Sequence, residues 1–419
     1  MTAHAPSTRF YGWRVVAAAF TLAVFGWGIG FYGPPVYLHA VREARGWSLP
    51  MISTAVTVHF LVGAIIVANL PGLYRRYGLP TVTKTGAISL ALGVLGWAAA
   101  TTPWHLFAAT LLSGAGWVAM GAAAVNAIIS PWFVRTRPAA LAMAYNGASI
   151  GGVIFSPLWV AAIGLFGFPV AAASIGAAMT IVIWLLSDFV FSRTPHQMGL
   201  TPDGDIAGIP SATVTSPAAR PLPGQKLWRS LTFVTLSAGM ALGLFAQIGL
   251  IAHLFSLLVP ALGPQQAGLA MGLATAAAIG GRTIVGWLMP VGADRRLIAC
   301  ASYAVQIAGA IAFIFAAGES VPLLLLGVIL FGAGIGNATS LPPLIAQVEF
   351  VKEDVSRVVA LVVAIGQGTY AFAPAAFGLV RELSPTAASG APGSELLLFA
   401  AAACIQGLAV CAFLAGRRK

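Results

Sequence analysis

Charged residues are scarce in this 419-residue sequence, where Asp, Glu, Lys and Arg together make up 8% of the chain. Soluble domains carry about 25%. Acidic residues are the rarer sign, with 11 Asp and Glu against 22 Lys and Arg, while hydrophobic residues make up 59%. A chain with so few charges cannot give a soluble fold a polar surface, so the composition predicts a protein that crosses a membrane several times.

Residues typical of metal, redox or covalent chemistry are also few. The three cysteines, Cys300, Cys404 and Cys411, lie in apolar runs without metal-binding or redox spacing. The sequence shows no Ser/His/Asp spacing, phosphate-binding loop or paired carboxylates at plausible positions. We therefore expect no enzyme activity, no cofactor and no metal ion. Residues 1–10 lack the short apolar core of a cleaved signal peptide.

Long apolar runs are abundant, and each is long enough to cross the hydrocarbon core of a bilayer as a helix of about 20 residues. They predict an all-α integral membrane protein with twelve transmembrane helices. The twelve windows cover residues 13–38, 50–73, 80–100, 103–130, 138–164, 168–191, 229–258, 264–290, 295–316, 320–346, 355–382 and 394–416.

The distribution of cations predicts the orientation in the membrane. With twelve spans both termini lie on one side, and segments on that side hold all but four of the 22 Lys and Arg, namely Arg42, Arg45, Arg381 and Arg282. The positive-inside rule places both termini in the cytoplasm, and a bacterial inner membrane is the expected location. Because the basicity is a topology signal, we expect no nucleic-acid partner.

The sequence divides into two groups of six spans, residues 1–191 and 229–419. Residues 192–228, rich in Pro, Gly, Ser and Thr, predict a cytoplasmic linker between them. The Gly-Ala-Gly triplet at 114–116 returns at 332–334. Parallel repeats of six spans place a substrate site at their interface, and rocking of the halves alternates access to it. We expect a monomer, because two such halves enclose their own pathway.

Arg282 is the one formal charge between residues 230 and 293. An ionised guanidinium at membrane depth costs about 2.5–3.5 kcal/mol even on insertion-based scales, so it requires a wet cavity, a partner or a ligand. No acidic residue in that stretch can pair with it. Its planar fork suits a carboxylate, so we predict that Arg282 binds an anionic substrate. The alternative is a structural role, with the side chain extending toward the cytoplasmic headgroups.

Polar side chains within the spans supply the other candidate substrate contacts. Gln367 and Tyr370 are three residues apart and therefore share a helix face. Asn337 lies among glycines and prolines, where the tenth span is expected to break. For Asn126, helix packing is the alternative role. The full set of predicted substrate-binding residues is Arg282, Asn126, Tyr145, Asn146, Asn337, Gln367, Tyr370, Tyr32, Tyr37 and Gln247.

Two histidines within spans, His59 and His253, are the candidates for proton coupling, because imidazole titrates near physiological pH. A structural role is the alternative for both. No Asp or Glu is expected at mid-depth in a span. Proton symport, anion exchange and uniport therefore all remain open.

Several local patterns carry a family resemblance. They are Tyr-Gly-Trp-Arg at 11–14, Gly-Trp-Ser at 46–48, Arg-Thr-Arg-Pro at 135–138, Gly-Leu-Thr-Pro-Asp-Gly at 199–204, and Gly281-Arg282. With the six-plus-six arrangement, the sequence resembles the major facilitator superfamily over essentially its whole length. More narrowly, it resembles the monocarboxylate transporter and oxalate–formate antiporter branch. That resemblance implies two pseudo-symmetric six-helix bundles and a role for Arg282 in holding the substrate carboxylate.

The sequence departs from the family pattern at three places. Arg75 stands where the loop after the second span usually carries an acid. Ala278 stands where animal monocarboxylate transporters carry an aspartate, one turn before the arginine. The eleventh span has no lysine, so the two-cation arrangement of oxalate carriers is absent. A single positive group suits a monoanion better than a dianion.

These observations favour a secondary transporter that moves a small, lactate-like monocarboxylate across the lipid bilayer, with protons or a counter-anion as partner. One alternative is a proton-driven exporter of drugs or organic cations, which would require a buried carboxylate. Another is a non-transporting membrane sensor on the same helices.

Overall fold

The computed structural model describes residues 10–204, 227–290, 293–383 and 395–417, and its secondary structure is helical. The first half runs through helices α1 (Gly12–Gly30), α2 (Pro34–Arg45), α3 (Leu49–Tyr77), α4 (Leu79–Ala99), α5 (Pro103–Ala119), α6 (Ala122–Ile129), α7 (Arg137–Phe166) and α8 (Phe168–Leu186). A π-helical turn η1 (Ser187–Phe191) and two 3-10 turns, η2 (His196–Met198) and η3 (Pro202–Gly204), follow. Of the predicted linker, residues 205–226 lie outside the described residues.

The second half consists of α10 (Leu231–Leu262), α11 (Pro264–Leu288), α12 (Arg295–Ala316), α13 (Val321–Glu349), α14 (Lys352–Tyr370), α15 (Ala373–Glu382) and α16 (Leu396–Ala415). Within the described ranges, twelve helical stretches are long and apolar enough to cross a membrane. The predicted number of spans is confirmed. The predicted end of the first span at residue 38 is too early, since helix continues to Arg45.

Proline accounts for two of the breaks inside spans. The first span is interrupted at residues 31–33, directly before Pro34 and Pro35. The eleventh is interrupted between Tyr370 and Ala373, directly before Pro374. Proline lacks an amide hydrogen and its ring clashes with the carbonyl four residues earlier, so the preceding turn of helix is lost. The freed backbone groups then become available to other partners.

Three pairs of neighbouring spans are joined by a single glycine in a conformation that other residues rarely adopt. Gly78, Gly167 and Gly263 have φ of 79°, 77° and 75° with ψ between 151° and 162°. This combination belongs essentially to glycine alone. Because a proline follows within two residues each time, the next helix begins at once. These tight joints fix α3 against α4, α7 against α8, and α10 against α11.

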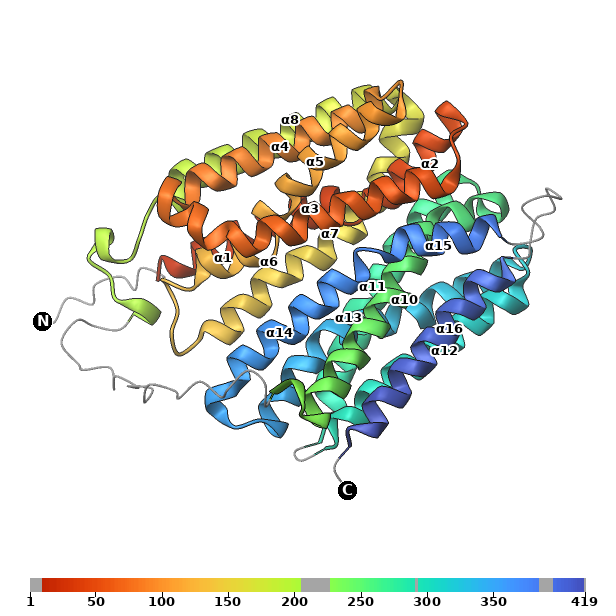
Figure 1. The fold of residues 1–419 in the computed structure, drawn as a ribbon. Helices are drawn as coiled ribbons and strands as arrows, with labels where there is room; N and C mark the ends of the chain where they lie inside the picture. The colour runs from red at the N-terminus through yellow and green to blue at the C-terminus, as the bar shows by residue number, and fades with distance from the viewer. Residues whose placement is uncertain (1–9, 205–226, 291–292, 384–394, 418–419) are drawn as a thin grey trace, which may run out of the picture.

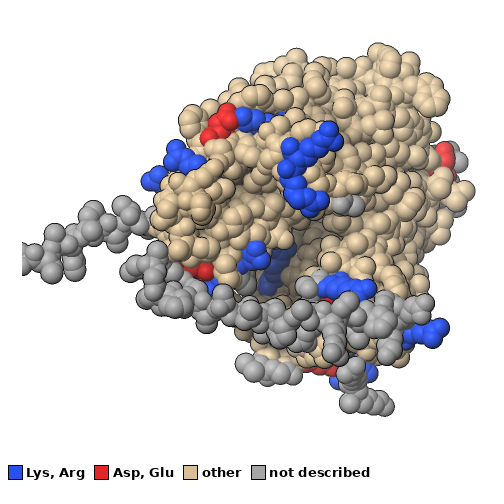
Figure 2. All heavy atoms as spheres, turned by 60° about the vertical axis from the view of Figure 1, so that its left-hand side comes forward, with Lys and Arg blue, Asp and Glu red and all other residues tan. Residues whose placement is uncertain are grey.

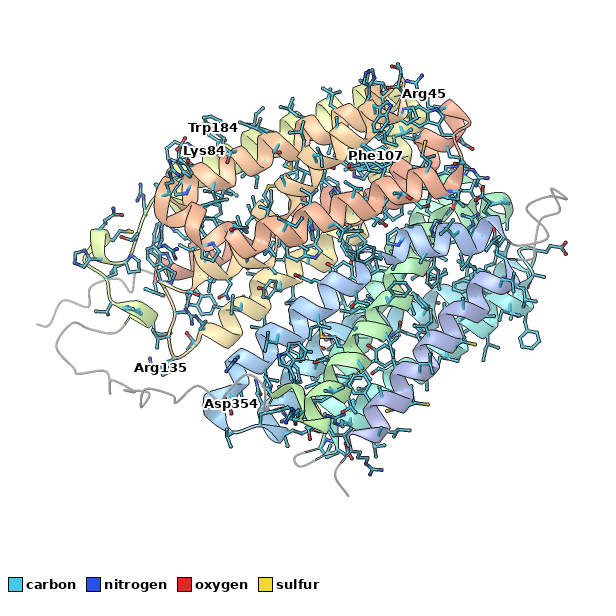
Figure 3. The ribbon with its side chains drawn as sticks, viewed as in Figure 1. Arg45, Lys84, Phe107, Arg135, Trp184 and Asp354 are labelled. Atoms are coloured by element: carbon cyan, nitrogen blue, oxygen red, sulfur yellow. The ribbon has the colours of Figure 1, made fainter. Side chains whose placement is uncertain are left out.

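The helices form two bundles that lie side by side along nearly common axes (Figure 1). We call the end where α1 begins and α16 ends the terminal face, and the opposite end the far face. Figure 3 places Arg45 at the far face, and Lys84, Arg135 and Asp354 toward the terminal face. The two bundles meet along α7 and α11, α3 and α15, and α2 and α10.

The contact between α3 and α15 closes the molecule toward the far face. The amide of Ala375, in the first turn of α15, has no partner within its helix. It donates to Thr57 Oγ1 of the other half at 3.1 Å. One turn on, Gly378 lies so close to Ser53 that a Cβ on the glycine would come within 2.6 Å of the serine hydroxyl. The break before α15 thus supplies a hydrogen bond between the halves.

The other inter-half contacts lie in the same part of the molecule. A Cβ built on Gly272 of α11 would lie 3.0 Å from the carbonyl of Val153 in α7. The ring of His39 in α2 meets the ring of Phe255 in α10 edge to face, with centroids 5.1 Å apart. All these residues belong to the portions of their helices nearer the far face. The halves are therefore packed together there.

The terminal face is open by comparison. Figure 2 brings this end forward and shows a hollow with Lys and Arg side chains at its rim and in its depth. A groove of about 790 Å³ also runs along the terminal part of α1 beside α7, within the first half, lined by Phe10, Trp13, Val16, Ala17, Phe20, Thr21 and Met143. The described molecule is closed toward the far face and hollowed at the terminal face.

Candidate functional site

Small residues bring α11 and α13 into close contact around Arg282. A Cβ built on Gly281 would lie 2.0 Å from the carbonyl oxygen of Ala333, and one built on Gly336 would lie 2.5 Å from that of Ala278. Gly residues at such contacts let membrane helices approach closely. The approach lets Arg282 Nε donate to the Gly336 carbonyl at 3.1 Å. That bond fixes where the guanidinium lies.

The charge of Arg282 has no carboxylate partner within the described part of the chain. The side chain is partly buried, and the ion pairs found among these residues all involve other cations. Its one described hydrogen bond uses Nε. The two terminal nitrogens, which form the outer prongs of the guanidinium fork, can still bind a carboxylate side by side.

Tyr32 links this guanidinium to the first half of the protein. It lies in the break between α1 and α2, within electrostatic range of Arg282 and within hydrogen-bonding reach of the Thr275 hydroxyl. Thr275 precedes Arg282 by two helical turns on the same face of α11. Gly152 of α7 packs on both, since its Cβ would come 2.7 Å from the Tyr32 ring and 2.6 Å from Thr275. Arg282 therefore lies just beyond the point where the halves meet.

Aromatic rings of the first half form a continuous group beside this point, which we call the aromatic wall. Trp27 meets Trp117 at 5.2 Å and Tyr145 at 6.3 Å between ring centroids. Phe31 meets Tyr32 at 5.0 Å and Trp117 at 5.9 Å. Phe31 and Phe60 are 5.9 Å apart. The wall consists of Trp27, Phe31, Tyr32, Phe60, Trp117 and Tyr145.

Three of the predicted contacts lie on α6 and α7. Tyr145 belongs to the aromatic wall, and its hydroxyl donates to the Ala122 carbonyl at 3.0 Å, where the fourth span breaks. Asn126 is exposed and accepts a hydrogen bond from Ser130 at 2.9 Å, one turn along its own helix. Asn146 is also exposed. Among these, Tyr145 is tied by contacts to the site around Tyr32.

The predicted contacts of the second half are divided between the interface and the interior. Tyr370 at the end of α14 faces the Phe60 ring at 5.8 Å, so it joins the aromatic wall from the other half. Gln367 is partly buried one turn before it. Asn337 and Gln247 are each 3% exposed, and their side-chain carbonyl oxygens have no hydrogen-bond partner among the residues that the structure describes. Asn337 directly follows Gly336, which holds Arg282.

Tyr37 lies away from this site, in the core of the first half. It is 1% exposed, and its hydroxyl donates to the Ile29 carbonyl at 3.1 Å. Its ring is packed between Trp159 at 4.8 Å and Phe168 at 5.3 Å. The break in the first span at residues 31–33 separates the two tyrosines and turns their rings toward different neighbours. We leave Tyr37 out of the proposed site.

The two candidate histidines are buried and tie helices within one half. His59 Nε2 donates to the Gly30 carbonyl at 2.9 Å, and its Nδ1 lies 2.8 Å from Ser113 Oγ. His253 Nε2 donates to the Pro374 carbonyl at 3.0 Å, while its Nδ1 meets no partner in the described part of the chain. Both positions are accounted for by a structural role, and proton coupling through them remains a prediction. In the described ranges, no three His, Cys, Asp or Glu side chains form a metal-binding group.

The sequence matches the family profile of the Major Facilitator Superfamily over residues 16–374. This chain belongs to the Major Facilitator Superfamily. Monocarboxylate transporter 13 of Rattus norvegicus is 27% identical over 290 residues, which cover 68% of this chain and 62% of the rat protein. MFS-type transporter 1 of Ophiocordyceps sp. (strain BCC 1869) is 29% identical over 198 residues, covering 45% of this chain and 42% of the fungal protein. The matches thus span less than two thirds of either relative.

Solved structures of the superfamily share the fold at low sequence identity. A D-xylose-proton symporter superposes with a TM-score of 0.73 and 14% identity, over 96% of this chain and 97% of the symporter. A bacterial homologue of the human lysosomal transporter Spinster, in an inward-facing state, gives a TM-score of 0.71 and 15% identity, over 99% and 100%. With its twelve apolar helices, this chain is an integral, multi-pass membrane protein of a superfamily whose members are transporters rather than enzymes.

The transporter also contains polar contacts that sequence patterns did not indicate. Arg296 at the start of α12 is buried and paired with Glu349 at the end of α13, with Nε and Oε1 2.6 Å apart. Lys84 pairs with Asp188 and lies over the Trp184 ring at 4.6 Å, as Figure 3 shows for the two labelled side chains. Neither partner lies within 50 residues of its cation, so local spacing carries no signal for these pairs.

One further contact holds the segment after the sixth span. The Asp203 carboxylate accepts hydrogen bonds from the amides of Val134, Arg135 and Thr136 at 2.8–3.1 Å and from the Thr136 hydroxyl at 2.6 Å. These groups belong to the three residues directly before α7, which begins at Arg137. The turn at 201–204 was visible in the sequence, but its binding site was not.

Proposed function

We propose that this transporter carries a small organic monocarboxylate, whose carboxylate is held by the terminal nitrogens of Arg282. The observation that supports this proposal is a partly buried guanidinium at the junction of the two halves, with one carbonyl and no carboxylate as its partner. A bound monoanion would neutralise the charge of Arg282, and its carboxylate would accept hydrogen bonds from the two terminal nitrogens of the guanidinium. The rat relative is named a monocarboxylate transporter, which agrees with this cargo.

Alternating access follows from the same geometry. A substrate entering the hollow at the terminal face would reach Arg282 where the packed part of the interface begins. Rocking of the halves would open the far face by separating Thr57 from Ala375 and His39 from Phe255, while closing the terminal ends. With the termini in the cytoplasm, as the cation distribution predicts, the present state is open to the cytoplasm. The coupling partner is a proton or a counter-anion.

Uptake into proteoliposomes tests this function. Radiolabelled lactate, pyruvate, formate and oxalate would be offered to the wild type, Arg282→Ala and Arg282→Lys, each with and without a pH gradient. Two charge-assisted hydrogen bonds contribute about 1.5–3 kcal/mol each, and about 1.4 kcal/mol is tenfold, so Arg282→Ala should lose at least about 100-fold in monoanion uptake. Lysine keeps the charge but loses the fork, so Arg282→Lys should remain impaired.

The matched control is Arg75→Ala, which removes an exposed arginine at the terminal end of α3 and should leave uptake unchanged. Stimulation by a pH gradient would assign proton coupling, and stimulation by anion loaded inside the vesicles would assign exchange. Transport of an organic cation that is unaffected by Arg282→Ala would contradict the proposed cargo.

A further inference from the structure

The aromatic wall presents open ring surface next to the proposed carboxylate site. Trp27, Phe31, Tyr32 and Tyr145 of the wall, and Tyr370 facing it, are all partly exposed although they lie deep within their spans. The contacts of Tyr32 with Thr275 and of Phe60 with Tyr370 run between the halves, which places this surface on the interface rather than on lipid. Aromatic side chains that line a binding site supply most of its apolar contact area.

The rings are held in an orientation that favours stacking with another ring. Trp27 meets Trp117 at an interplanar angle of 84° and Tyr145 at 81°, and Phe31 meets Tyr32 at 83°. In an edge-to-face pair, the edge of one ring covers one face of the other. A planar ligand ring can add to such a group by offset stacking or by a further edge-to-face contact.

The wall consists mostly of ring carbon, so it offers few polar contacts to a short hydroxy or keto acid. The Tyr145 hydroxyl donates to the Ala122 carbonyl at 3.0 Å, and the Tyr32 hydroxyl is within reach of Thr275. A lactate-sized anion bound at Arg282 would leave most of the ring surface facing water. A larger apolar body would remove that surface from water, which is favourable in proportion to the area covered.

We infer that the monocarboxylate bound at Arg282 carries an aromatic ring, joined to its carboxylate directly or through one carbon, and that the aromatic wall binds this ring. The inference rests on the proposed function of Arg282 as the carboxylate site. Tyr32 relates the two sites, because it contacts Phe31 within the wall and packs against Gly152 together with Thr275, which precedes Arg282 by two turns of α11. The carboxylate and the ring of the ligand must therefore be close neighbours, as in benzoate or phenylacetate. This class replaces the lactate-like cargo that the sequence suggested.

Uptake measurements in proteoliposomes, with one defined acid at a time, test the inference. Uptake of radiolabelled benzoate and phenylacetate would be compared with that of acetate, lactate and cyclohexanecarboxylate. The last has the same ring size as benzoate but no aromatic faces, so it separates stacking from apolar volume. One to two aromatic contacts correspond to about a tenfold difference, so the KM for benzoate should be at least about tenfold below that for acetate and severalfold below that for cyclohexanecarboxylate.

Variants of Trp27 locate the effect in the wall. Trp27→Leu should raise the KM for benzoate by about tenfold while changing that for acetate little, and Trp27→Phe, which keeps a ring, should recover most of the loss. The matched control is Trp287→Leu at the end of α11, where the indole is 86% exposed. Thermal unfolding of each variant would show that it remains folded.

The outcomes separate this inference from the proposed function. Arg282-dependent uptake of lactate or acetate with a KM equal to or below that of benzoate would overturn the aromatic ring and keep the carboxylate site. Equal KM values for benzoate and cyclohexanecarboxylate would also overturn it. If no monocarboxylate is carried in an Arg282-dependent way, the proposed function itself fails.

Discussion

Two arginines in the second half, Arg282 and Arg296, lie between helices in surroundings that differ sharply. Arg296 is 1% exposed. Its Nε and Nη2 donate to the two carboxylate oxygens of Glu349 at 2.6 and 2.8 Å. The remaining donors reach Thr235 Oγ1 at 3.1 Å and the carbonyls of Phe413 and Thr232 at 3.2 and 2.9 Å. This arginine ties α10, α12, α13 and α16 together.

Arg282 has one described hydrogen bond, to a carbonyl, and no carboxylate. Both side chains carry the same charge into a membrane-spanning bundle, so the comparison separates two uses of a deep arginine. Where every donor is satisfied by the protein, the charge holds helices in place. Where the terminal guanidinium nitrogens lack a described protein partner at the junction of the two halves, as at Arg282, the charge is available to a ligand.

The largest expected effect is on the thermal stability of the protein when the partner of Arg296 is removed. Glu349→Ala leaves Arg296 buried without its counter-charge, and breaking a buried pair in this way costs about 3–5 kcal/mol. Thermal unfolding of the purified protein in detergent should therefore shift strongly downward. Arg296→Met combined with Glu349→Leu should restore part of the loss, because no unpaired charge then remains in the interior.

Two controls belong to the same measurement. Glu319→Ala removes an exposed acid and should leave the unfolding temperature unchanged. Arg282→Met loses one hydrogen bond of about 1 kcal/mol but also removes a partly buried charge, so its net effect should be small. If Arg282→Met destabilises the protein as much as Glu349→Ala, the two arginines play the same structural role and the comparison fails.

The sequence was sufficient to predict the spans and the isolation of Arg282, because both depend on local composition. Twenty apolar residues in a row indicate a span whatever they pack against. A lone cation in such a run is conspicuous for the same reason. The end of the first span was placed too early because the apolar run gives way to His39, Arg42 and Glu43, whereas α2 continues as helix to Arg45.

The neighbours of each residue could not be predicted in the same way. Arg296 and Glu349 are 53 residues apart, and from the sequence Arg296 counted only as one of the loop cations. Tyr32 and Tyr37 were both plausible site residues, yet one lies at the interface and the other among Trp159 and Phe168. The aromatic wall draws on α1, α3, α5 and α7, so no single helical period reveals it.

A substitution that shifts the Arg282 guanidinium without removing it should have a smaller effect and tests the comparison of Arg282 with Arg296 further. Gly336→Ala would place a Cβ 2.5 Å from the Ala278 carbonyl and 3.1 Å from Arg282 Nε. The two helices must separate or the arginine must shift, at a cost of about 1–3 kcal/mol for overpacking. Substrate affinity should fall severalfold in the uptake assay, with a modest decrease in the unfolding temperature.

The control for this substitution lies on α11 itself. A Cβ on Gly280 would meet nothing within 4 Å, so Gly280→Ala should leave both affinity and stability essentially unchanged. Unchanged affinity in Gly336→Ala would mean that the position of Arg282 relative to α13 has no bearing on the substrate, which the proposed site does not allow.

The smallest expected effect concerns a charge held by the protein outside the spans, at Asp203. Burial by itself opposes ionisation, yet hydrogen bonds from the Thr136 hydroxyl and from the amides of Arg135, Thr136 and Val134 lower the pKa of Asp203 from 3.8 to about 2. A carboxyl whose pKa is depressed on folding stabilises the folded state above its unfolded pKa, and that contribution is lost as the pH falls toward 2. Because the site is largely solvated, screening should keep the effect below about 1 kcal/mol.

The difference in unfolding temperature between the wild type and Asp203→Asn should therefore be small at pH 6 and shrink between pH 4 and pH 2. A difference that stays constant over that range would show that the carboxylate charge does not hold the start of α7, and that satisfied charges matter in this protein only where they are buried.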